Sequence, residues 1–419
     1  RYRFILESGQ GFYERILTLQ ADAGDLMKRK SGEYVTQAIT GESYRAYLPA
    51  PLPPDPPLAL DTGLLQSMDQ ANRALGRLDG ISRVWPNSGH FLNQLLYHYV
   101  RKEAVLSSQI EGTQSSLSDL LLYELEETPG VPLDDVQEVS SYVAALSHGL
   151  TRIREGFPLS LRLLREIHGV LLATGRGANK SPGEFRRSQN WLGGSRPGNA
   201  AFVPPPPERL MDCLGPFEHF LHDEPEPVPS LIKAALAHVH FETIHPFLDG
   251  NGRLGRMLIT FLLCHDKVLQ DPLLYLSLYF KIHRSDYYDH LQRVRTEGDW
   301  EGWLRFFLDG VTETATEATD AAQKLWILFD EDRRRIQEQG KISATALRVH
   351  DLLQQRPILS ITAACKALEL THPAVNKSLR KLEEMGIVRE ITGRQRNRLY
   401  LYDAYMTILS EGLEPAAVE

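Results

Sequence analysis

The sequence predicts a mainly α-helical protein with one β-hairpin insertion and a C-terminal winged helix-turn-helix domain. Three observations support this fold class. From residue 60 to about residue 308, Leu, Ile, Val and Tyr recur at three- and four-residue spacing, the period of amphipathic helices. Residues 185–204 break that period, because a turn rich in Gly, Pro and Asn lies between apolar residues. After residue 340, three helical patterns precede two apolar runs around a basic tip, the order of a winged helix.

The size and charge of the chain exclude several classes of protein. At 419 residues it exceeds one ordinary compact core, so two or three domains are expected. Its 42% hydrophobic and 24% charged residues exclude a collagen-like or mainly disordered chain. A net charge of −8 argues against a chain that binds polyanions over its whole surface.

Cysteine usage and hydropathy indicate the compartment. The three cysteines, Cys213, Cys264 and Cys365, lie far apart, which excludes a disulfide framework or a CxxC zinc site and favours a reducing compartment. The longest strongly apolar run, residues 257–264, is too short to span a bilayer. No basic-then-apolar signal segment is present, so we expect a cytoplasmic protein without a membrane segment.

Individual elements follow from the local pattern. Residues 1–40 show no clear period, and residues 49–57 (PAPLPPDPP) predict an extended, polyproline-type segment laid along its own domain. Residues 312–340 predict a charged, solvated connecting helix. Core helices are expected at residues 91–110, 136–153, 159–172, 231–244 and 253–264. The C-terminal domain is expected to hold helices at 344–353, 361–370 and 372–386 and strands at 387–389 and 399–402.

The segment from His245 to Arg256 (HPFLDGNGRLGR) is the most informative for chemistry. Its glycines permit backbone angles that turn successive N–H groups toward one point at the start of a helix, which is an anion cradle suited to phosphate. Arg253 and Arg256, about one helical turn apart, can present guanidinium groups to the same phosphates. Asp249 offers an oxygen ligand for Mg²⁺, and His245 can accept a proton near neutral pH.

Three other interpretations of this segment are weaker. Its glycines satisfy the GxGxxG pattern of dinucleotide-binding folds, with Asp271 near the spacing of a ribose-binding acid, but Pro246 cannot sit in the central strand that such a fold requires. His238 and His240 could join His245 as metal ligands, yet helical phase spreads them around the axis. A solvated, Gly-rich helix start would not explain one His, one Asp and two Arg side chains concentrated together.

The segment resembles the signature of Fic-domain proteins, H-x-F-x-[DE]-G-N-G-R-x-x-R, at every specified position. The resemblance extends over roughly residues 45–310. Residues 181–186 (SPGEFR) are similar to the family's entry to a hairpin flap, and Tyr287-Tyr288 and residues 294–308 to its closing helices. The resemblance implies a Fic (Fido) helical core and a protein adenylyltransferase, since family members mostly transfer AMP from ATP to a hydroxyl side chain of a protein.

The resemblance also implies a role for each motif residue. His245 would be the general base for the target hydroxyl, and Asp249 would hold Mg²⁺. The α- and β-phosphates of ATP would lie on a cradle formed by Gly250, Asn251 and Gly252. The β- and γ-phosphates would bind Arg253 and Arg256. The hairpin at residues 185–204 would dock an extended target segment carrying Ser, Thr or Tyr, and self-modification fits the family. The Lys-containing variant of a kinase-like branch is absent.

Residues 107–112 (SSQIEG) resemble the family's inhibitory motif [ST]-x-x-x-E-[GN], matched by Ser107, Glu111 and Gly112. Gly112 is placed to end the helix at residues 91–110, and a Glu in a last helical turn is mildly disfavoured by the helix dipole. The resemblance implies that Glu111 pairs with Arg256 and denies it to the γ-phosphate, with Ser107 seating the helix. The chain is therefore expected to be autoinhibited in cis.

The C-terminal module is basic within an acidic chain. Residues 341–403 hold eleven Lys and Arg against six acids, a net charge of +5 that leaves −13 for the rest. A recognition helix and a wing tip would present side chains to phosphates; these are Lys377, Arg380, Lys381, Arg394, Arg396 and Arg398. Binding to DNA and docking of another protein both remain open.

These inferences define an organisation and two alternative functions. We expect an N-terminal region at 1–90, the inhibitory helix and Fic core at 91–310, a linker helix at 311–340 and the winged helix at 341–410. The first alternative is a DNA-binding regulator whose pocket senses nucleotide without turnover, and the second is removal of AMP, with Glu111 orienting water. A homodimer is a further expectation.

Overall fold

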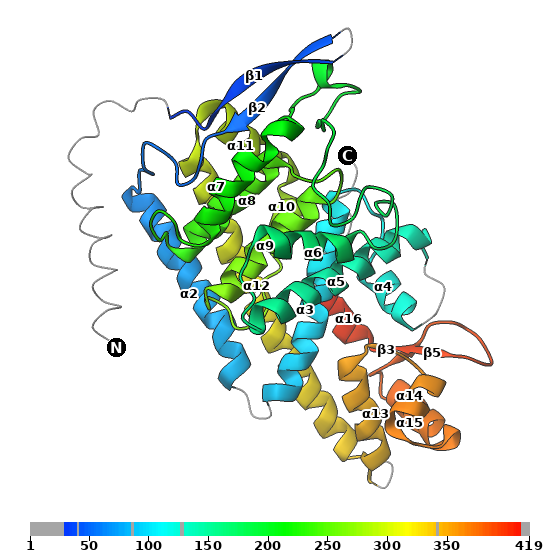
Figure 1. The fold of residues 1–419 in the computed structure, drawn as a ribbon. Coiled ribbons are helices and arrows are strands. Elements are labelled where there is room, and N and C mark those ends of the chain that lie inside the picture. The colour runs from blue at the N-terminus through cyan, green and yellow to red at the C-terminus, as the bar shows by residue number, and fades with distance from the viewer. Residues whose placement is uncertain (1–28, 40–41, 85–87, 126–129, 341–342, 412–419) are drawn as a thin grey trace. The chain divides into compact units, whose positions relative to one another are not determined.

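The structure is a computed structural model that describes residues 29–39, 42–84, 88–125, 130–340 and 343–411. The chain divides into two units. The first comprises residues 1–70, 185–251 and 285–309, and the second comprises residues 71–184, 252–284 and 310–419. The described residues are mainly helical, with one two-stranded and one three-stranded antiparallel sheet (Figure 1), so the predicted fold class is confirmed.

A β-hairpin near the N-terminus belongs to the first unit. Strands β1 (Gly32–Ile39) and β2 (Glu42–Pro49) pair antiparallel, with Tyr34 opposite Tyr47. The Tyr47 N–H donates to the carbonyl of Val203 at 2.9 Å, so the hairpin is attached to the end of the predicted flap. The sequence analysis found no period in residues 1–40, and it therefore missed β1.

The predicted hairpin at residues 185–204 forms only in part. Leu192 and Phe202 exchange two backbone hydrogen bonds, of 2.8 and 3.1 Å, and this isolated bridge replaces the expected strands. Local hydrogen bonds compete with a longer ladder: the Oδ1 atom of Asn199 accepts the N–H groups of Ser195 and Arg196, each at 3.0 Å. A 3₁₀ turn, η1 (Pro197–Asn199), forms the tip.

The helices of the first unit surround a fully buried one. They are η2 (Pro207–Arg209), α7 (Leu210–Leu221), α8 (Ser230–Ile244), α11 (Arg284–Glu297) and the beginning of α12 (Trp300–Gln337). Every residue of α8 after Ser230 is buried, as the apolar run predicted. His238 lies within this core, where its Nε2 atom is 2.8 Å from the Tyr287 hydroxyl and its ring stacks on Trp303. His238 is therefore a buried structural histidine.

The second unit holds most of the predicted core helices. They are α2 (Thr62–Val84, from Ala71 onward), α3 (Ser88–Ile110), α4 (Leu117–Glu124), α5 (Leu133–Arg154), α6 (Leu161–Leu171), α9 (Asn251–His265) and α10 (Ser277–Ile282). Gly149 of α5 faces Phe261 of α9 so closely that a Cβ atom would overlap the ring. This close approach packs α5 against α9, the helix that begins inside the signature segment.

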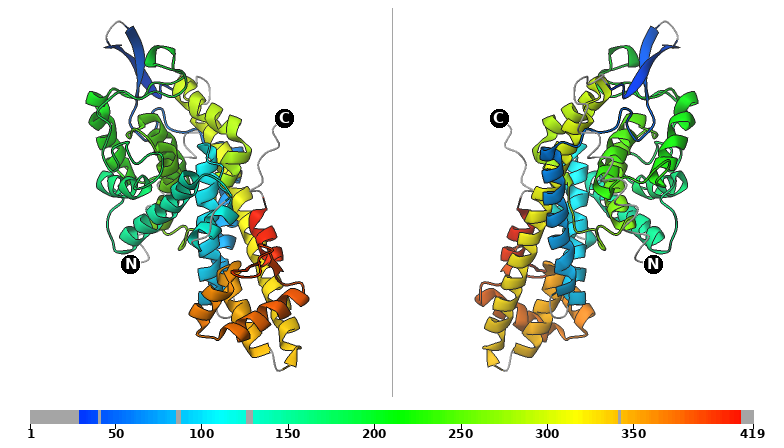
Figure 2. Two further views of the ribbon diagram at one scale, coloured as in Figure 1. Left: turned by 90° about the vertical axis from the view of Figure 1, so that its right-hand side faces the viewer. Right: turned by 90° about the vertical axis from the view of Figure 1, so that its left-hand side faces the viewer.

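Helix α12 differs from the predicted solvated linker. It is a single helix of 38 residues from Trp300 to Gln337, so the expected boundary at residue 311 falls inside it. Its buried side chains include Ala318, Leu325 and Phe329. In the second unit the Tyr99 hydroxyl of α3 donates to the Ala318 carbonyl at 2.6 Å, and Figure 2 shows the two helices running together. Most of the charged residues that suggested a connector are exposed or half-buried, but Asp332 is buried and accepts a hydrogen bond from the Tyr402 hydroxyl at 2.7 Å.

The winged-helix domain matches the predicted order of elements. It consists of α13 (Ser343–Gln355), β3 (Ile358–Ser360), α14 (Ile361–Leu368), α15 (His372–Glu384), β4 (Arg389–Glu390), β5 (Leu399–Leu401) and an unpredicted α16 (Asp403–Ser410). The strands form a sheet in the order β3-β5-β4. The domain packs on α3 of the same unit, where Gln94 bonds to Gln354 at 3.3 Å and His98 meets Tyr405 edge-to-face.

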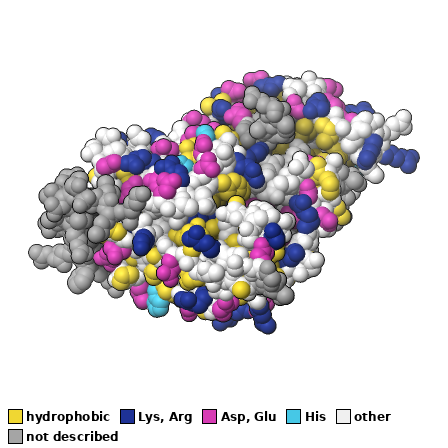
Figure 3. Space-filling view, turned by 90° about the horizontal axis from the view of Figure 1, so that it is seen from above, with side chains coloured by type: hydrophobic (Ala, Val, Ile, Leu, Met, Phe, Trp, Pro, Cys, Tyr) yellow, Lys and Arg dark blue, Asp and Glu magenta, His cyan; other side chains and the backbone are white. Residues whose placement is uncertain are grey.

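Surface charge and hydropathy complete the description. Acidic and basic side chains are interspersed over the face in Figure 3, as the modest net charge suggests. Among the described residues, no helix has the length and apolar character needed to cross a membrane.

Candidate active site

His245 occupies a strained and firmly held position in the first unit. It ends α8 in the left-handed conformation, with φ of 50°, and its N–H donates to Phe241 O at 2.9 Å. The Arg186 guanidinium donates to the His245 carbonyl at 2.8 Å and to the Pro205 carbonyl at 2.5 Å. Burial lowers the pKa of Arg186 to about 10, so it stays charged at neutral pH. Arg186, from the SPGEFR segment, therefore fixes the backbone of the candidate base.

The loop after His245 is closed by its own side chains. The Asn251 amide accepts from the Phe247 N–H and donates to the Phe247 carbonyl, both at 2.9 Å. The Asp249 carboxylate accepts the Gly250 N–H at 2.6 Å, and Gly250 has a φ of 76°, which favours glycine. The Asn251 side-chain amide is thus engaged within the loop. Any contribution of Asn251 to an anion cradle would come from its backbone N–H.

The second half of the signature, from Gly252 onward, lies in the second unit on the first turns of α9. There the Arg256 guanidinium binds the end of α3 through three hydrogen bonds. Nε donates to the Ser107 hydroxyl at 2.8 Å, and Nη2 donates to the Ser107 carbonyl at 2.9 Å and to Glu111 Oε1 at 2.6 Å. The Arg256 side chain is 2% exposed and that of Glu111 is 36% exposed. The pairing expected from the inhibitory motif is therefore present.

Two glycines allow this pairing. Gly112 follows α3 with a φ of 97°, as expected of a residue that ends a helix, and lets the chain turn directly after Glu111. At Gly252 a Cβ atom would overlap the Glu111 carboxylate, so any side chain here would push Glu111 away from α9. The signature glycine at position 252 thus leaves room for the Glu111 carboxylate.

Two buried acidic residues that the sequence did not predict lie near the signature arginines, and one of them contacts Arg253. Glu138 of α5, which is buried, accepts from Arg253 at 3.3 Å and from Arg176 at 2.7 Å. Glu103 of α3 lies one turn before Ser107 and accepts from the hydroxyl of Tyr142 and from Ser277. The available signal was a carboxylate within the apolar stripe of each helix, since buried acids need partners.

Burial gives Glu103 an unusual titration. It raises the pKa of Glu103 to about 7, although the Ser277 hydrogen bonds and the nearby Arg256 charge oppose the shift. An acid whose pKa is higher in the folded than in the unfolded chain binds protons preferentially in the folded state. Its contribution to stability is therefore complete at acidic pH and is lost as the pH rises through about 7.

We expect Glu103→Gln to change the pH dependence of unfolding. The amide cannot ionise, so the variant should gain on the order of 2 kcal/mol relative to wild type between about pH 5 and about pH 8. Urea unfolding followed by circular dichroism at both pH values measures the difference. Glu184→Gln, at an exposed carboxylate, is the matched control. If the free energies of unfolding of wild type and Glu103→Gln differ by the same amount at both pH values, this account is contradicted.

The remaining candidate residues have diverse environments. His240 is buried against Phe217, and burial lowers its pKa to about 4. The described residues contain no group of three or more His, Cys, Asp or Glu side chains that could hold a metal. In the winged helix, Arg398 bonds to Asn376 at 3.4 Å and Lys381 pairs with Glu384, whereas the other four of the six predicted basic residues are exposed; these are Lys377, Arg380, Arg394 and Arg396.

Comparison with known families identifies the class of protein. Residues 65–151 match the Fic/DOC family N-terminal region, residues 158–263 match the Fic/DOC family, and residues 342–389 match a winged helix-turn-helix DNA-binding domain. The three matched segments of the chain therefore correspond to a Fic/DOC N-terminal region, a Fic domain and a C-terminal winged helix.

Named relatives and a solved structure are similar to parts of this chain. It is 32% identical over 254 residues to the protein adenylyltransferase Fic of Aedes aegypti, covering 60% of this chain and 44% of the relative. It is 30% identical over 261 residues to the protein adenylyltransferase Fic of Drosophila grimshawi, covering 61% of this chain and 49% of that relative. A Fic family protein from Desulfovibrio desulfuricans G20 shares the fold, with a TM-score of 0.54 and 19% identity over 83% of this chain and 97% of that one. The chain thus spans about half the length of the curated relatives it matches.

Proposed function

We propose that this chain is a protein adenylyltransferase that moves AMP from ATP to a hydroxyl side chain of a protein, and that Glu111 inhibits it in cis. The observation that carries the proposal is the complete Fic signature between His245 and Arg256, with Arg256 held by Glu111 at 2.6 Å. The names of the relatives from Aedes and Drosophila support the same reaction.

The chemistry follows from the motif residues. His245 takes the proton of the target hydroxyl as its oxygen attacks the α-phosphorus of ATP. The new O–P bond forms while the bond between the α-phosphorus and the bridging oxygen breaks, and pyrophosphate leaves. The N–H groups at the start of α9 (Asn251–His265) and the Arg253 guanidinium stabilise the phosphate charge. Such transfers depend on positioning and charge stabilisation, which these groups supply.

Mg²⁺ is part of this proposal, with Asp249 as its protein ligand. Mg²⁺ on a nucleotide is usually held by one or two carboxylates together with phosphate oxygens and water. A single acid, Asp249, fits that pattern. When bound, the ion would neutralise phosphate charge during the transfer. Asp249 would orient it relative to the loop that Asn251 closes.

The inhibition and the docking of the target also rest on specific contacts. While Arg256 binds Ser107 and Glu111, its guanidinium is engaged and cannot orient the γ-phosphate. For docking, the Val203 carbonyl already accepts from β2 (Glu42–Pro49), so we assign the target segment to the arm around Trp191, which is 36% exposed. Self-modification, a homodimer and DNA binding by residues 341–403 remain predictions of the sequence.

The proposal is tested by following the fate of the nucleotide. We incubate Glu111→Gly protein with Mg²⁺ and ATP labelled at either the α- or the γ-phosphate. Label from the α-position should appear on protein and label from the γ-position should not, because pyrophosphate leaves. Label from the γ-position alone would show a kinase instead. No protein label from either position, with the variant folded, would overturn the proposal.

A further inference from the structure

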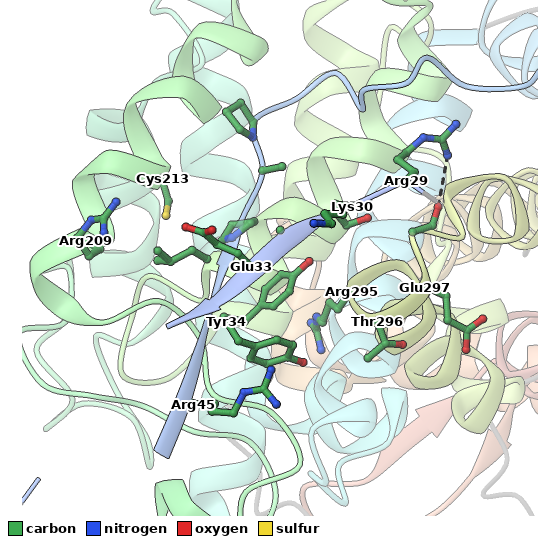
Figure 4. Close-up of a pocket in the computed structure, with 18 of the residues that line it drawn as sticks. Arg29, Lys30, Glu33, Tyr34, Arg45, Arg209, Cys213, Arg295, Thr296 and Glu297 are labelled. Carbon is green, nitrogen blue, oxygen red and sulfur yellow. Dashed lines mark hydrogen bonds between the residues drawn. The ribbon is translucent and has the colours of Figure 1, made fainter. Parts of the chain in front are cut away.

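A cavity of about 1370 Å³ lies in the first unit, beneath the β1–β2 hairpin. None of the signature residues 245–256 is among the residues that line it. It is lined by β1 and β2, by the start of α7 and by the end of α11. Figure 4 shows Tyr34, Arg45 and Arg295 on the same side of this space, with Arg209 of η2 and Cys213 of α7 on another. Because the cavity exceeds the roughly 300–1000 Å³ of ordinary small-molecule pockets, it can hold a larger ligand.

The cavity contains a buried positive charge without a matching ion pair. Arg295 is 9% exposed and donates to the Thr243 hydroxyl at 3.1 Å and to the Glu242 carbonyl at 3.3 Å, both uncharged acceptors. Its guanidinium also lies 4.0 Å from the centre of the Phe202 ring. Among the described side chains, no carboxylate forms a close ion pair with Arg295, although the charge of the buried Glu242 acts on it; burial lowers the pKa of Arg295 to about 10. A buried cation of this kind is stabilised when an anion binds beside it.

Two buried hydroxyls line the same cavity. Tyr47 is 1% exposed, Ser31 is 9% exposed, and neither hydroxyl oxygen has a hydrogen-bond partner in the described part of the chain. Gly32 begins β1 directly after Ser31, and a Cβ atom there would overlap the end of the Tyr47 ring, so glycine makes room for the phenol. Buried polar groups are normally satisfied, and two unsatisfied ones facing one cavity indicate an acceptor that binds between them.

The surrounding charges favour an anion, and the strand favours a polypeptide. Five basic and three acidic residues line the cavity. Arg209 is paired with Asp212, whereas the Arg45 guanidinium lies over the Tyr34 ring. Strand β1 (Gly32–Ile39) is an edge strand of its sheet, so one side of its backbone can receive a further strand. The three acidic side chains that line the cavity would repel an anion that binds loosely. An anion is therefore selected by its hydrogen bonds to the buried hydroxyls of Tyr47 and Ser31.

We propose that this cavity binds an extended, acidic segment of the protein substrate, with a carboxylate placed against Arg295, the Tyr47 hydroxyl and the Ser31 hydroxyl. The proposal rests on the proposed function, because it assumes a protein substrate, and it names the chemistry that selects one. Arg295 bonds to Thr243, two residues before His245, so an anchored segment is held by the same rigid helix end that carries the base.

The test measures binding in the absence of ATP, with the full chain. The probes are a fluorescein-labelled peptide of alternating Thr and Glu, the same peptide with Gln at each Glu, and inorganic phosphate. We expect the acidic peptide to bind at least about tenfold more tightly than the Gln peptide, because a hydrogen bond to a charged group is worth about 1.5–3 kcal/mol. Tyr47→Phe and Ser31→Ala should each weaken the acidic peptide by about tenfold.

Control measurements show whether the Tyr47 hydroxyl binds the peptide or only stabilises the fold. Without peptide, Tyr47→Phe should melt no lower than wild type, since the deleted hydroxyl has no partner among the described residues. Tyr44→Phe, on the same strand but bonded to Gln189, should leave peptide affinity unchanged. Equal binding of the Gln peptide, or of the acidic peptide to Tyr47→Phe, overturns the proposal. Full competition by inorganic phosphate overturns its polypeptide part. Either failure leaves AMP transfer by Glu111→Gly untouched, so the two proposals are distinguished.

Discussion

Glu111→Gly protein should transfer AMP at least about tenfold faster than wild type, because a charge-assisted hydrogen bond of about 1.5–3 kcal/mol no longer holds Arg256. The Glu111 carboxylate lies 2.6 Å from Arg256 Nη2, and its removal leaves the hydrogen bonds from the guanidinium to Ser107 in place. Because the Glu111 side chain is 36% exposed, solvent screens the pair and the lower end of the range is expected. The initial rate of incorporation of α-labelled AMP into protein measures the effect.

Two further variants show whether the gain comes from charge or from a loosened helix. Glu111→Gln keeps the size of the side chain and removes its charge, so its rate should fall between wild type and Glu111→Gly. Gln109→Gly loosens the same last turn of α3 (Ser88–Ile110) and deletes a bond to Ser115 O, without touching Arg256. A gain in Gln109→Gly as large as in Glu111→Gly would contradict inhibition by the carboxylate.

The sequence predicted the parts of the fold that repeat a helical period. The helices around residues 91–110 and 231–244 agree with α3 and α8 to within a few residues, since their apolar spacing is unbroken. The strand β1 escaped prediction because its hydrophobic side chains are few and half exposed, as at Tyr34, which is 41% exposed. The boundary at residue 311 failed because exposed charges do not prevent a long helix from burying its opposite face.

The candidate site was predictable where one local motif contains its chemistry. The signature motif suggested His245, because helix ends and glycines act over a few residues, and the resemblance of residues 107–112 to an inhibitory motif suggested Arg256 as the partner of Glu111. The positioning contacts came from distant segments: Arg186 holds the His245 carbonyl, and Glu138 lies 115 residues from Arg253 in the chain. Burial also creates the raised pKa of Glu103, and burial is a property of the folded chain that residue type does not reveal.

His245→Ala in the Glu111→Gly background should lose about 10²- to 10⁴-fold in kcat for AMP transfer, which is the usual contribution of a positioned general base. The backbone of His245 has a φ of 50°, a conformation that alanine disfavours, so a distorted loop is a second cause of lost activity in this variant.

His245→Asn separates the two causes, because asparagine tolerates the left-handed region and cannot accept the proton as imidazole does. Both variants should lose the same activity while KM for ATP changes little, since the role proposed for His245 is on the hydroxyl and not on the phosphates. His219→Ala, at an exposed histidine of α7 (Leu210–Leu221), should retain full activity. Activity restored by His245→Asn would show that the loop conformation matters and that imidazole is not the base.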